Sequence, residues 1–363
     1  MNPSPEMPWP RRILRWSGAA LATVLVASVA GRALLQARER ERRRIDPAAG
    51  IDLLERITIG GVSQWLQIRG QDRRKPLLVW LHGGPGFPQM PFEAANRDLE
   101  RDFVVVHWDQ RGAGKSYHWG MKAGELRVEQ FVNDAHELVT AVLKRLGREK
   151  CFLVAHSWGT IIGAIEAARH PELFHAYVGV GQIAEFPENE RARYDFAVAA
   201  ATKDQNEAAL QDLRRIGPPP HPDLQTCAPM ERWVSFYAQR DHPGLGAMRF
   251  VRLAFSSPDY STVDLARIPA GYLFSYEALW REIYYDTNLF QRAPRIAVPV
   301  WFFVGRHDKV AFPSAVQRYC EALEAPAGKE IVWFEASAHW PFFEEPATFH
   351  TALRRVAAAE SVK

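Results

Sequence analysis

The sequence predicts an α/β fold in which a mostly parallel, twisted sheet is covered by helices on both faces. Short runs rich in β-branched and aromatic residues recur along the chain, and segments with helical periodicity separate them. Four of these runs are almost entirely apolar, as is typical of strands buried on both faces. They are residues 76–81, 103–108, 298–304 and 331–334.

The first two strands are expected to form a hairpin at one edge of the sheet. Residues 54–59 and 62–68 alternate between apolar and polar side chains on either side of Gly60 and Gly61. Two short alternating runs joined by such a pair predict a tight antiparallel turn.

One helix is predicted before the strand that leads to Ser157, and another is predicted after it. Residues 129–146 place apolar side chains on one face at helical spacing. Residues 158–169 form the second predicted helix, and His170-Pro171 ends it. A further strand is expected at residues 176–180, which continues the alternation of strands and helices.

This alternation divides the chain into a core in two parts and an insertion. Residues 51–181 and 296–363 are predicted to form the core. Residues 182–295 are predicted to form a helical cap, interrupted by the proline-rich stretch 217–220. Because lids over active sites often control access to the chemistry, substrate choice is expected to lie in the cap.

Residues 153–160 carry the strongest functional signal. They place Ser157 between a buried strand and a helix, with Ala155 and Gly159 two positions to either side. Such a serine sits on a tight turn that exposes its hydroxyl above the sheet edge, and small neighbours are needed because the turn packs backbone against backbone. Ser157 is therefore the predicted nucleophile.

Its expected partners follow in the order acid and then histidine. Asp308 and His339 each come just after a predicted strand. His339 would act as the base that activates the serine hydroxyl, and Asp308 would orient the imidazole ring. Glu185 is the second candidate for the acid.

Backbone amides are expected to stabilise the oxyanion that forms during acyl transfer. Trp158, directly after the nucleophile, supplies one. Gly84 or Gly83 in a glycine-rich loop supplies the other. His82 opens that loop and is expected to stabilise its turn.

The sequence 109–116, Asp-Gln-Arg-Gly-Ala-Gly-Lys-Ser, invites comparison with a phosphate-binding loop. That motif needs a glycine where Asp109 stands, so nucleotide binding is not expected. The segment is expected instead to brace the active site, with Arg111 paired to a carboxylate.

Together, the HGGPG loop at 82–86, the loop at 109–116 and the Ser-Trp-Gly elbow resemble the prolyl aminopeptidase (proline iminopeptidase) type of α/β-hydrolase. The resemblance runs from about Leu53 to the C-terminus. It implies the α/β-hydrolase fold and an acidic cap residue that binds a substrate amine. The WxxWE-like string that carries this residue in the family is absent here, and residues 231–237 are the nearest stretch. The candidate amine ligands in the cap are Glu185, Glu188, Glu190 and Glu231.

The expected function is therefore hydrolysis of an ester or amide bond in a small molecule or short peptide, through an acyl-enzyme on Ser157. Release of an N-terminal proline is one form of this activity. A carboxylesterase or amidase acting on small apolar substrates is the alternative, and a non-catalytic binding protein with the same fold is the second. No metal or organic cofactor is expected to take part.

Charge separates the N-terminus from the rest of the chain. Residues 1–44 hold nine arginines against three glutamates, whereas the remainder holds 36 basic and 39 acidic residues. The folded part is therefore slightly acidic, and no nucleic-acid partner is expected. The three cysteines, at 151, 227 and 320, have spacings that suggest neither a disulfide framework nor a metal site.

Residues 1–50 are predicted to be an anchor or signal segment with a linker. Arginines precede an uncharged stretch at 16–31, which is close to the shortest helix that can span a membrane. A single N-terminal membrane anchor is the first interpretation. Export after cleavage of a signal peptide near Ala30 is the alternative.

Overall fold

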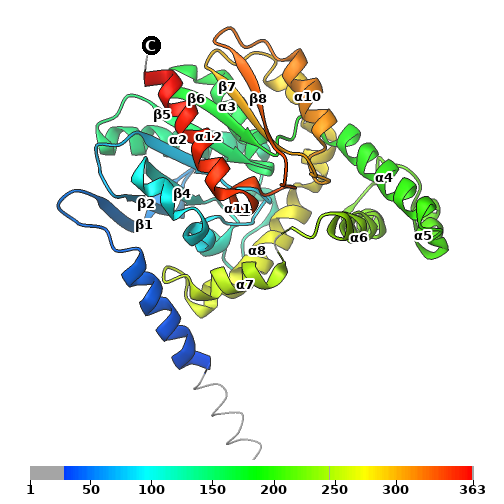
Figure 1. The fold of residues 1–363 in the computed structure, drawn as a ribbon, viewed down its shortest axis with the longest axis horizontal. Helices are drawn as coiled ribbons and strands as arrows, with labels where there is room; N and C mark the ends of the chain where they lie inside the picture. The colour runs from blue at the N-terminus through cyan, green and yellow to red at the C-terminus, as the bar shows by residue number, and fades with distance from the viewer. Residues whose placement is uncertain (1–27, 245, 362–363) are drawn as a thin grey trace, which may run out of the picture.

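The computed structural model describes residues 28–361 apart from residue 245, and Figure 1 shows their arrangement. The strands form one eight-stranded sheet in the order β1-β2-β4-β3-β5-β6-β7-β8. The strands are β1 Ile51–Ile59, β2 Val62–Gly70, β3 Leu77–Leu81, β4 Val104–Asp109, β5 Cys151–His156, β6 Phe174–Val180, β7 Val300–Gly305 and β8 Lys329–Phe334.

The sheet is antiparallel at one edge and parallel elsewhere, as predicted. Strand β1 pairs with β2, and β2 pairs with β4, in antiparallel register, whereas the pairs from β4 through β3 to β8 are parallel. The predicted hairpin around Gly60 and Gly61 is present, with Ile59 opposite Val62.

Helices cover both faces of the sheet (Figure 1). Helices α2, α3 and α10 pack on one face, and α11 and α12 pack on the other. The central strand β3 is apolar along its whole length because both of its faces are buried. Val79 packs into the core on one face, and Leu78 and Trp80 pack into the core on the other. The helices are α2 Val128–Leu146, α3 Trp158–Arg169, α10 Pro313–Ala322, α11 Pro341–Glu344 and α12 Pro346–Ser361.

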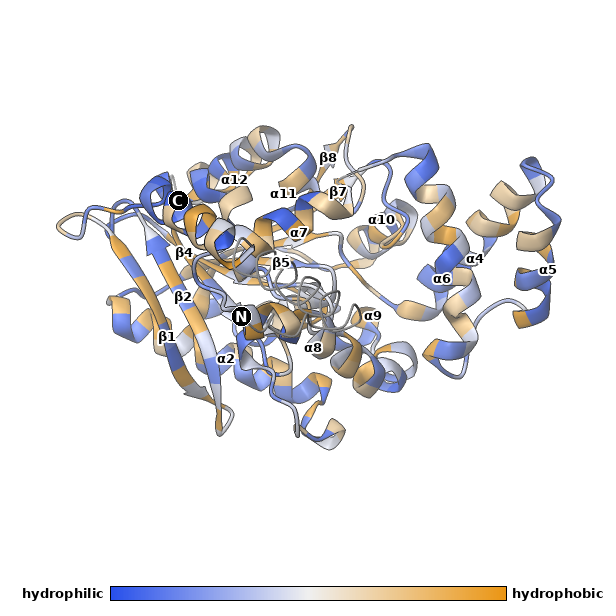
Figure 2. Cartoon of the chain, turned by 90° about the horizontal axis from the view of Figure 1, so that it is seen from below, coloured by the Kyte–Doolittle hydropathy of each residue, from blue (hydrophilic) through white to orange (hydrophobic). Residues whose placement is uncertain are grey.

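A helical segment, here called the cap, lies between β6 and β7. It comprises α4 Phe186–Lys203, α5 Glu207–Ile216, α6 Leu224–Asp241, α7 Ala247–Ser256, α8 Thr262–Arg281, a π-helical turn Glu282–Asp286 and α9 Leu289–Arg292. Helices α4, α5 and α6 form a small separate core together with Trp280 of α8 and Tyr284 of the π-helical turn, and they project beyond the sheet. Figure 2 shows blue and orange residues interleaved along these helices, consistent with one buried and one solvated face.

Short 3-10 helices occupy several of the loops. They are η1 Met90–Ala95, η2 Arg97–Arg101, η3 Gly114–Ser116, η4 Ala123–Glu125 and η5 Pro171–Leu173.

The chain enters the fold through a helix at residues 28–42 that lies against the cap. Arg32 donates to the carbonyls of Phe255 and Tyr260, at 3.2 and 2.6 Å. Gln36 donates to the carbonyl of Ser257 at 2.8 Å. Most of the predicted anchor at 16–31 lies outside the described residues. Within the described part of the chain, no helix combines the length and apolar composition that crossing a bilayer requires.

A buried ion pair ties the hairpin to α2. Arg111 donates to both carboxylate oxygens of Asp134, at 2.6 and 2.9 Å, and its guanidinium also reaches the carbonyl of Gly60 at 3.3 Å. Gln64 of β2 and Gln130 of α2 donate to the same carboxylate. The expected carboxylate partner of Arg111 is thus Asp134.

Replacing Asp134 by alanine should lower the free energy of unfolding by about 3–5 kcal/mol, because the buried Arg111 charge would lose its partner. Glu55→Ala is the matched control, since Glu55 pairs with Arg145 on the surface and its loss should cost less than about 1 kcal/mol. Urea denaturation measures both. Equal losses in the two variants would contradict the structural role given to Asp134.

Candidate active site

Ser157 occupies the turn between β5 and α3, as its sequence context predicts. Its backbone has φ 52° and ψ −122°, a conformation that residues with a side chain seldom adopt. The turn is held by a hydrogen bond from the Ser157 N–H to the carbonyl of Val180, at 2.9 Å. The strain is therefore offset by pairing with the neighbouring strand, and the side chain faces a cavity.

Gly159 explains why this turn needs a small residue two positions after the serine. A Cβ at Gly159 would lie 2.5 Å from the carbonyl oxygen of Leu81 and 2.7 Å from that of His82. Both contacts are to backbone atoms that the sheet and the glycine loop hold in place. The first turn of α3 can therefore approach β3 only without a side chain at this position.

His339 and Asp308 meet through a buried hydrogen bond. The His339 Nδ1 atom lies 2.8 Å from Asp308 Oδ2. The carboxylate oxygen accepts this hydrogen bond from Nδ1, which leaves Nε2 as the nitrogen available to Ser157. The other carboxylate oxygen of Asp308 accepts from the backbone N–H groups of Val310 and Ala311, at 2.7 and 2.9 Å. Asp308 is thus both a capping residue of its own loop and the partner of His339.

Gly181, just after β6, makes room for this pair. It has φ 56°, and a Cβ built on it would lie 2.9 Å from His339 Cε1 and 3.5 Å from Asp308 Oδ2. The imidazole therefore packs directly against the backbone that follows β6.

His156 supports the loop that carries His339. This role was not predicted from the sequence. Its Nε2 atom donates to the carbonyl of His339 at 3.0 Å, and its ring packs against Trp340 at 4.6 Å between centroids. Burial holds the pKa of His156 well below its ordinary value, so the ring stays neutral. Its position directly before the elbow serine places His156 near the site, but its partner lies 183 positions away and could not be predicted from the sequence.

The glycine loop is held by side chains of the 109–116 segment. His82 Nδ1 donates to the carbonyl of Gly83 at 2.8 Å, while its Nε2 accepts from the Gln110 N–H at 3.1 Å. Burial lowers the pKa of His82 to about 4, which is consistent with this neutral form. The Gln110 side chain donates to the His82 carbonyl and accepts from the Trp158 indole, at 3.1 and 3.0 Å. The segment braces the site, as expected.

The two candidate oxyanion glycines differ in their surroundings. Gly84 lines the cavity beside Ser157 and Trp158. Gly83 packs behind the elbow, where a Cβ would lie 2.9 Å from His156 Nδ1 and 3.2 Å from Ser157 Cβ.

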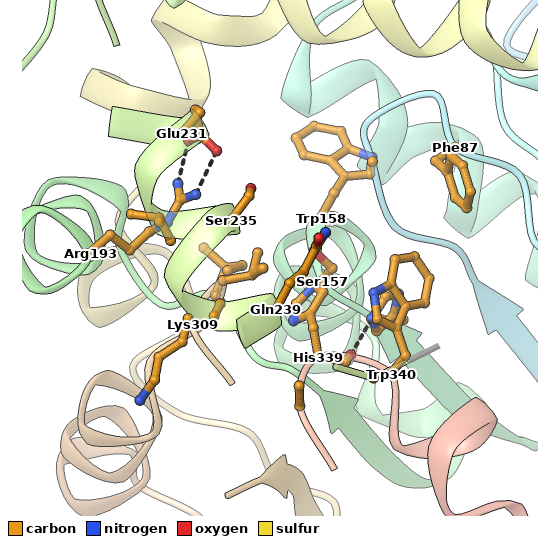
Figure 3. Close-up of a pocket in the computed structure, with 18 of the residues that line it drawn as sticks. Phe87, Ser157, Trp158, Arg193, Glu231, Ser235, Gln239, Lys309, His339 and Trp340 are labelled. Carbon is orange, nitrogen blue, oxygen red and sulfur yellow. Dashed lines mark hydrogen bonds and ion pairs between the residues drawn. The ribbon is translucent and has the colours of Figure 1, made fainter. Parts of the chain in front are cut away.

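The cavity between the sheet and the cap has a volume of about 680 Å³ and is shown in Figure 3. Ser157 and His339 lie at its base. Helix α6 lines one wall with side chains one turn apart, among them Glu231, Ser235 and Gln239. Aromatic side chains line much of the rest. They are Phe87, Trp158, Phe186, Phe250, Tyr272, Tyr276 and Trp340.

A charged cluster lies in the cap part of this cavity. Arg193 of α4 donates to Glu190 at 2.6 Å and to both oxygens of Glu231, each at 2.6 Å. Glu190 is fully buried, and its Oε2 atom has no hydrogen-bond partner among the residues that the structure describes. Burial raises the pKa of Glu190 above its ordinary value. Both glutamates are among the residues predicted from the sequence, whereas Arg193, one helical turn after Glu190, is not.

Glu185 is not brought to this cluster. Its carboxylate accepts from Arg318 at 2.7 Å and from the Asn288 side chain at 2.9 Å, and it does not line the cavity. It does not contact His339 either, whose carboxylate partner is Asp308. The Glu185 carboxylate instead links the cap to α10 through Arg318. The structure therefore does not support Glu185 as an amine ligand or as the carboxylate that orients His339.

The chain is similar in sequence to a known family and to known relatives. A family model described as the alpha/beta hydrolase fold matches residues 76–205. The probable aminopeptidase YbaC of Bacillus subtilis (strain 168) is 32% identical over 313 residues, which cover 84% of this chain and 96% of that relative.

Solved structures match in fold. A proline iminopeptidase from Mycobacterium smegmatis superposes with a TM-score of 0.62 at 22% identity, covering 85% of this chain and 99% of that chain. A membrane phospholipase A described as a bacterial virulence factor gives 0.60 at 18% identity, covering 97% and 99%. These likenesses concern the arrangement of the backbone.

Gly159→Ala should destabilise the protein by at least about 1–3 kcal/mol, because the added methyl group meets fixed backbone atoms of β3. Gly124→Ala is the matched control, since no heavy atom of residues 28–361 (apart from 245) lies within 4 Å of a Cβ built there. Thermal unfolding followed by circular dichroism should show a lower Tm for the first variant only. An unchanged Tm for Gly159→Ala would contradict the close approach described for the elbow.

Proposed function

The chain belongs to the α/β-hydrolase family, and on that premise we propose that it hydrolyses ester or amide bonds with Ser157 as nucleophile. The observation that carries this proposal is the hydrogen bond of 2.8 Å between His339 and Asp308 in the cavity that Ser157 faces. A serine on a strained turn, beside an imidazole whose Nδ1 bonds to a buried carboxylate, has the parts that acyl transfer requires.

In the proposed reaction, His339 Nε2 removes the proton from the Ser157 hydroxyl as its oxygen attacks the substrate carbonyl. The N–H groups of Trp158 and Gly84 stabilise the oxyanion, since both residues line the cavity next to the serine. His339 then gives its proton to the leaving group. Water, activated by His339, hydrolyses the acyl-enzyme and restores the serine.

We further propose that the substrate carries a free N-terminal amine. Two carboxylates face one guanidinium in the cluster of Glu190, Glu231 and Arg193, so the cluster is short of one positive charge when both are ionised. A substrate ammonium would supply that charge and would give Glu190 Oε2 the partner that it lacks. The 32% identical relative, described as a probable aminopeptidase, supports the same substrate class.

Aromatic side chains at the base of the cavity favour a small apolar residue, such as proline, on the acyl side of the bond. Phe87 packs against Trp340 at 5.8 Å between ring centroids, and Phe250 packs against the same indole at 5.4 Å. The same apolar surface would also suit the acyl group of a small ester, so a carboxylesterase or amidase is the competing function.

Ser157→Ala should abolish turnover of an activated ester and of an amino-acid anilide while leaving the Tm unchanged. Asp308→Asn should lower kcat on the order of 10⁴-fold, because the imidazole would lose the partner that fixes its tautomer. Steady-state kinetics on purified protein test both variants. Full activity of Ser157→Ala would rule out the serine mechanism, and an inactive wild-type protein that an active-site serine probe fails to label would favour the non-catalytic alternative.

The free amine can be tested by comparing proline anilide with its N-acetylated form. Glu190→Gln should lower kcat/KM about 10–100-fold for the free-amine substrate and leave a short-chain nitrophenyl ester nearly unaffected, because a charged hydrogen bond is lost. Glu188→Gln on the same helix is the matched control, since Glu188 pairs with Arg318 and does not line the cavity.

Hydrolysis of the ester alone, or equal loss for both substrates in Glu190→Gln, would reject the aminopeptidase function. The serine mechanism would stand in the first case, since it is tested separately by Ser157→Ala.

A further inference from the structure

A cluster of side chains of the types that bind metals lies outside the cavity, on the face of the sheet covered by α2 and α3. Glu166 and His170 are one helical turn apart at the end of α3, and His136 faces them from α2. The His136 Nδ1 atom lies 2.9 Å from Glu166 Oε1, and the two imidazole rings are 3.9 Å apart between centroids. One ligand atom from each of the three residues lies within 4.8 Å of the other two.

Glu166 is the unusual member of this cluster. Its side chain is 0% exposed, whereas those of His136 and His170 are 40% and 35% exposed. Within the described residues, Oε1 has a hydrogen-bond partner and Oε2 has none. Burial raises the pKa of this carboxyl. A buried carboxylate with an unpaired oxygen is costly unless another cation satisfies it.

We propose that His136, Glu166 and His170 bind a divalent zinc ion. Two imidazoles and one carboxylate form a common ligand set for zinc, with water in the fourth position. Magnesium and calcium prefer sites made of oxygen ligands, so the two imidazoles disfavour them. The ligand atoms of a tetrahedral zinc site lie about 3–3.5 Å apart. Small rotations of the two half-exposed imidazole rings would bring the three atoms to that spacing.

Carboxylates outnumber arginines among the charged groups bonded in and beside the cluster. Arg169 and Arg292 share the carboxylate of Glu129, the second at 2.6 Å, and Glu166 and Glu172 add two further carboxylates. His170 Nδ1 lies 3.4 Å from Glu172, whose carboxylate would orient the ring. The local field therefore does not prevent a cation from binding beside Glu166.

The zinc ion would join α2 to α3 and lie away from the reaction. Glu166 is nine residues after Ser157, which corresponds to about 13 Å along a helix. This inference does not rest on the proposed hydrolytic activity. The ion would hold together two helices that pack on the same face of the sheet, one of which begins at the nucleophile elbow.

The test uses the full chain, purified without a histidine tag and treated with a chelator that is then removed. Isothermal titration with zinc chloride should show one equivalent bound, and saturating zinc should raise the Tm, because only the folded state holds the ligands together. Magnesium chloride should do neither. The absence of stoichiometric zinc binding by the wild-type protein would overturn the proposal.

Substitutions of the two histidines test whether zinc binds at this cluster. His136→Ala and His170→Ala should each weaken zinc binding at least tenfold and remove the rise in Tm, and both residues are exposed enough that the fold should tolerate the change. His118→Ala is the matched control, since His118 is an exposed histidine outside the cluster. Zinc binding that survives both cluster substitutions, or that is lost equally in His118→Ala, would place the ion elsewhere and reject this site.

Discussion

The parallel pairing of β5, β6, β7 and β8 is the constraint on which the candidate active site depends. In a parallel sheet the carboxyl ends of neighbouring strands meet at one edge. Ser157 follows β5, Asp308 follows β7 and His339 follows β8, so residues separated by more than 180 positions in the chain converge there. The N–H of Ser157 bonds to the last residue of β6, which couples the strained turn directly to this pairing.

Much of this arrangement could be predicted from the sequence because the relevant signals are local. Continuous apolar runs predict buried strands, and a serine between a strand and a helix with small neighbours predicts the elbow. Helix α3 begins and ends at the predicted residues, Trp158 and Arg169. The carboxylate expected for Arg111 is present, although its identity as Asp134 depends on how α2 packs against the hairpin, which no local pattern encodes.

The contributions that were missed come from side chains whose partners are remote in sequence. Nothing near His156 indicates that it would hold the carbonyl of His339, because 183 positions separate them. Arg193 is one turn from Glu190, but its second carboxylate comes from α6. Glu185 illustrates the converse: a carboxylate close in sequence to the cap glutamates is directed to α10 by the fold. The sequence shows which residues carry a charge. The direction in which each charged side chain points depends on how the helices pack against one another.

The helix at residues 28–42 connects the N-terminal side of the chain directly to the cap. It is bonded to the segment between α7 and α8 through Arg32 and Gln36, and Arg43 just beyond it donates to both oxygens of Asp259. Asp259 also accepts from Gln67 of β2. A force applied along this helix would therefore reach the segment between α7 and α8 before it reaches β1.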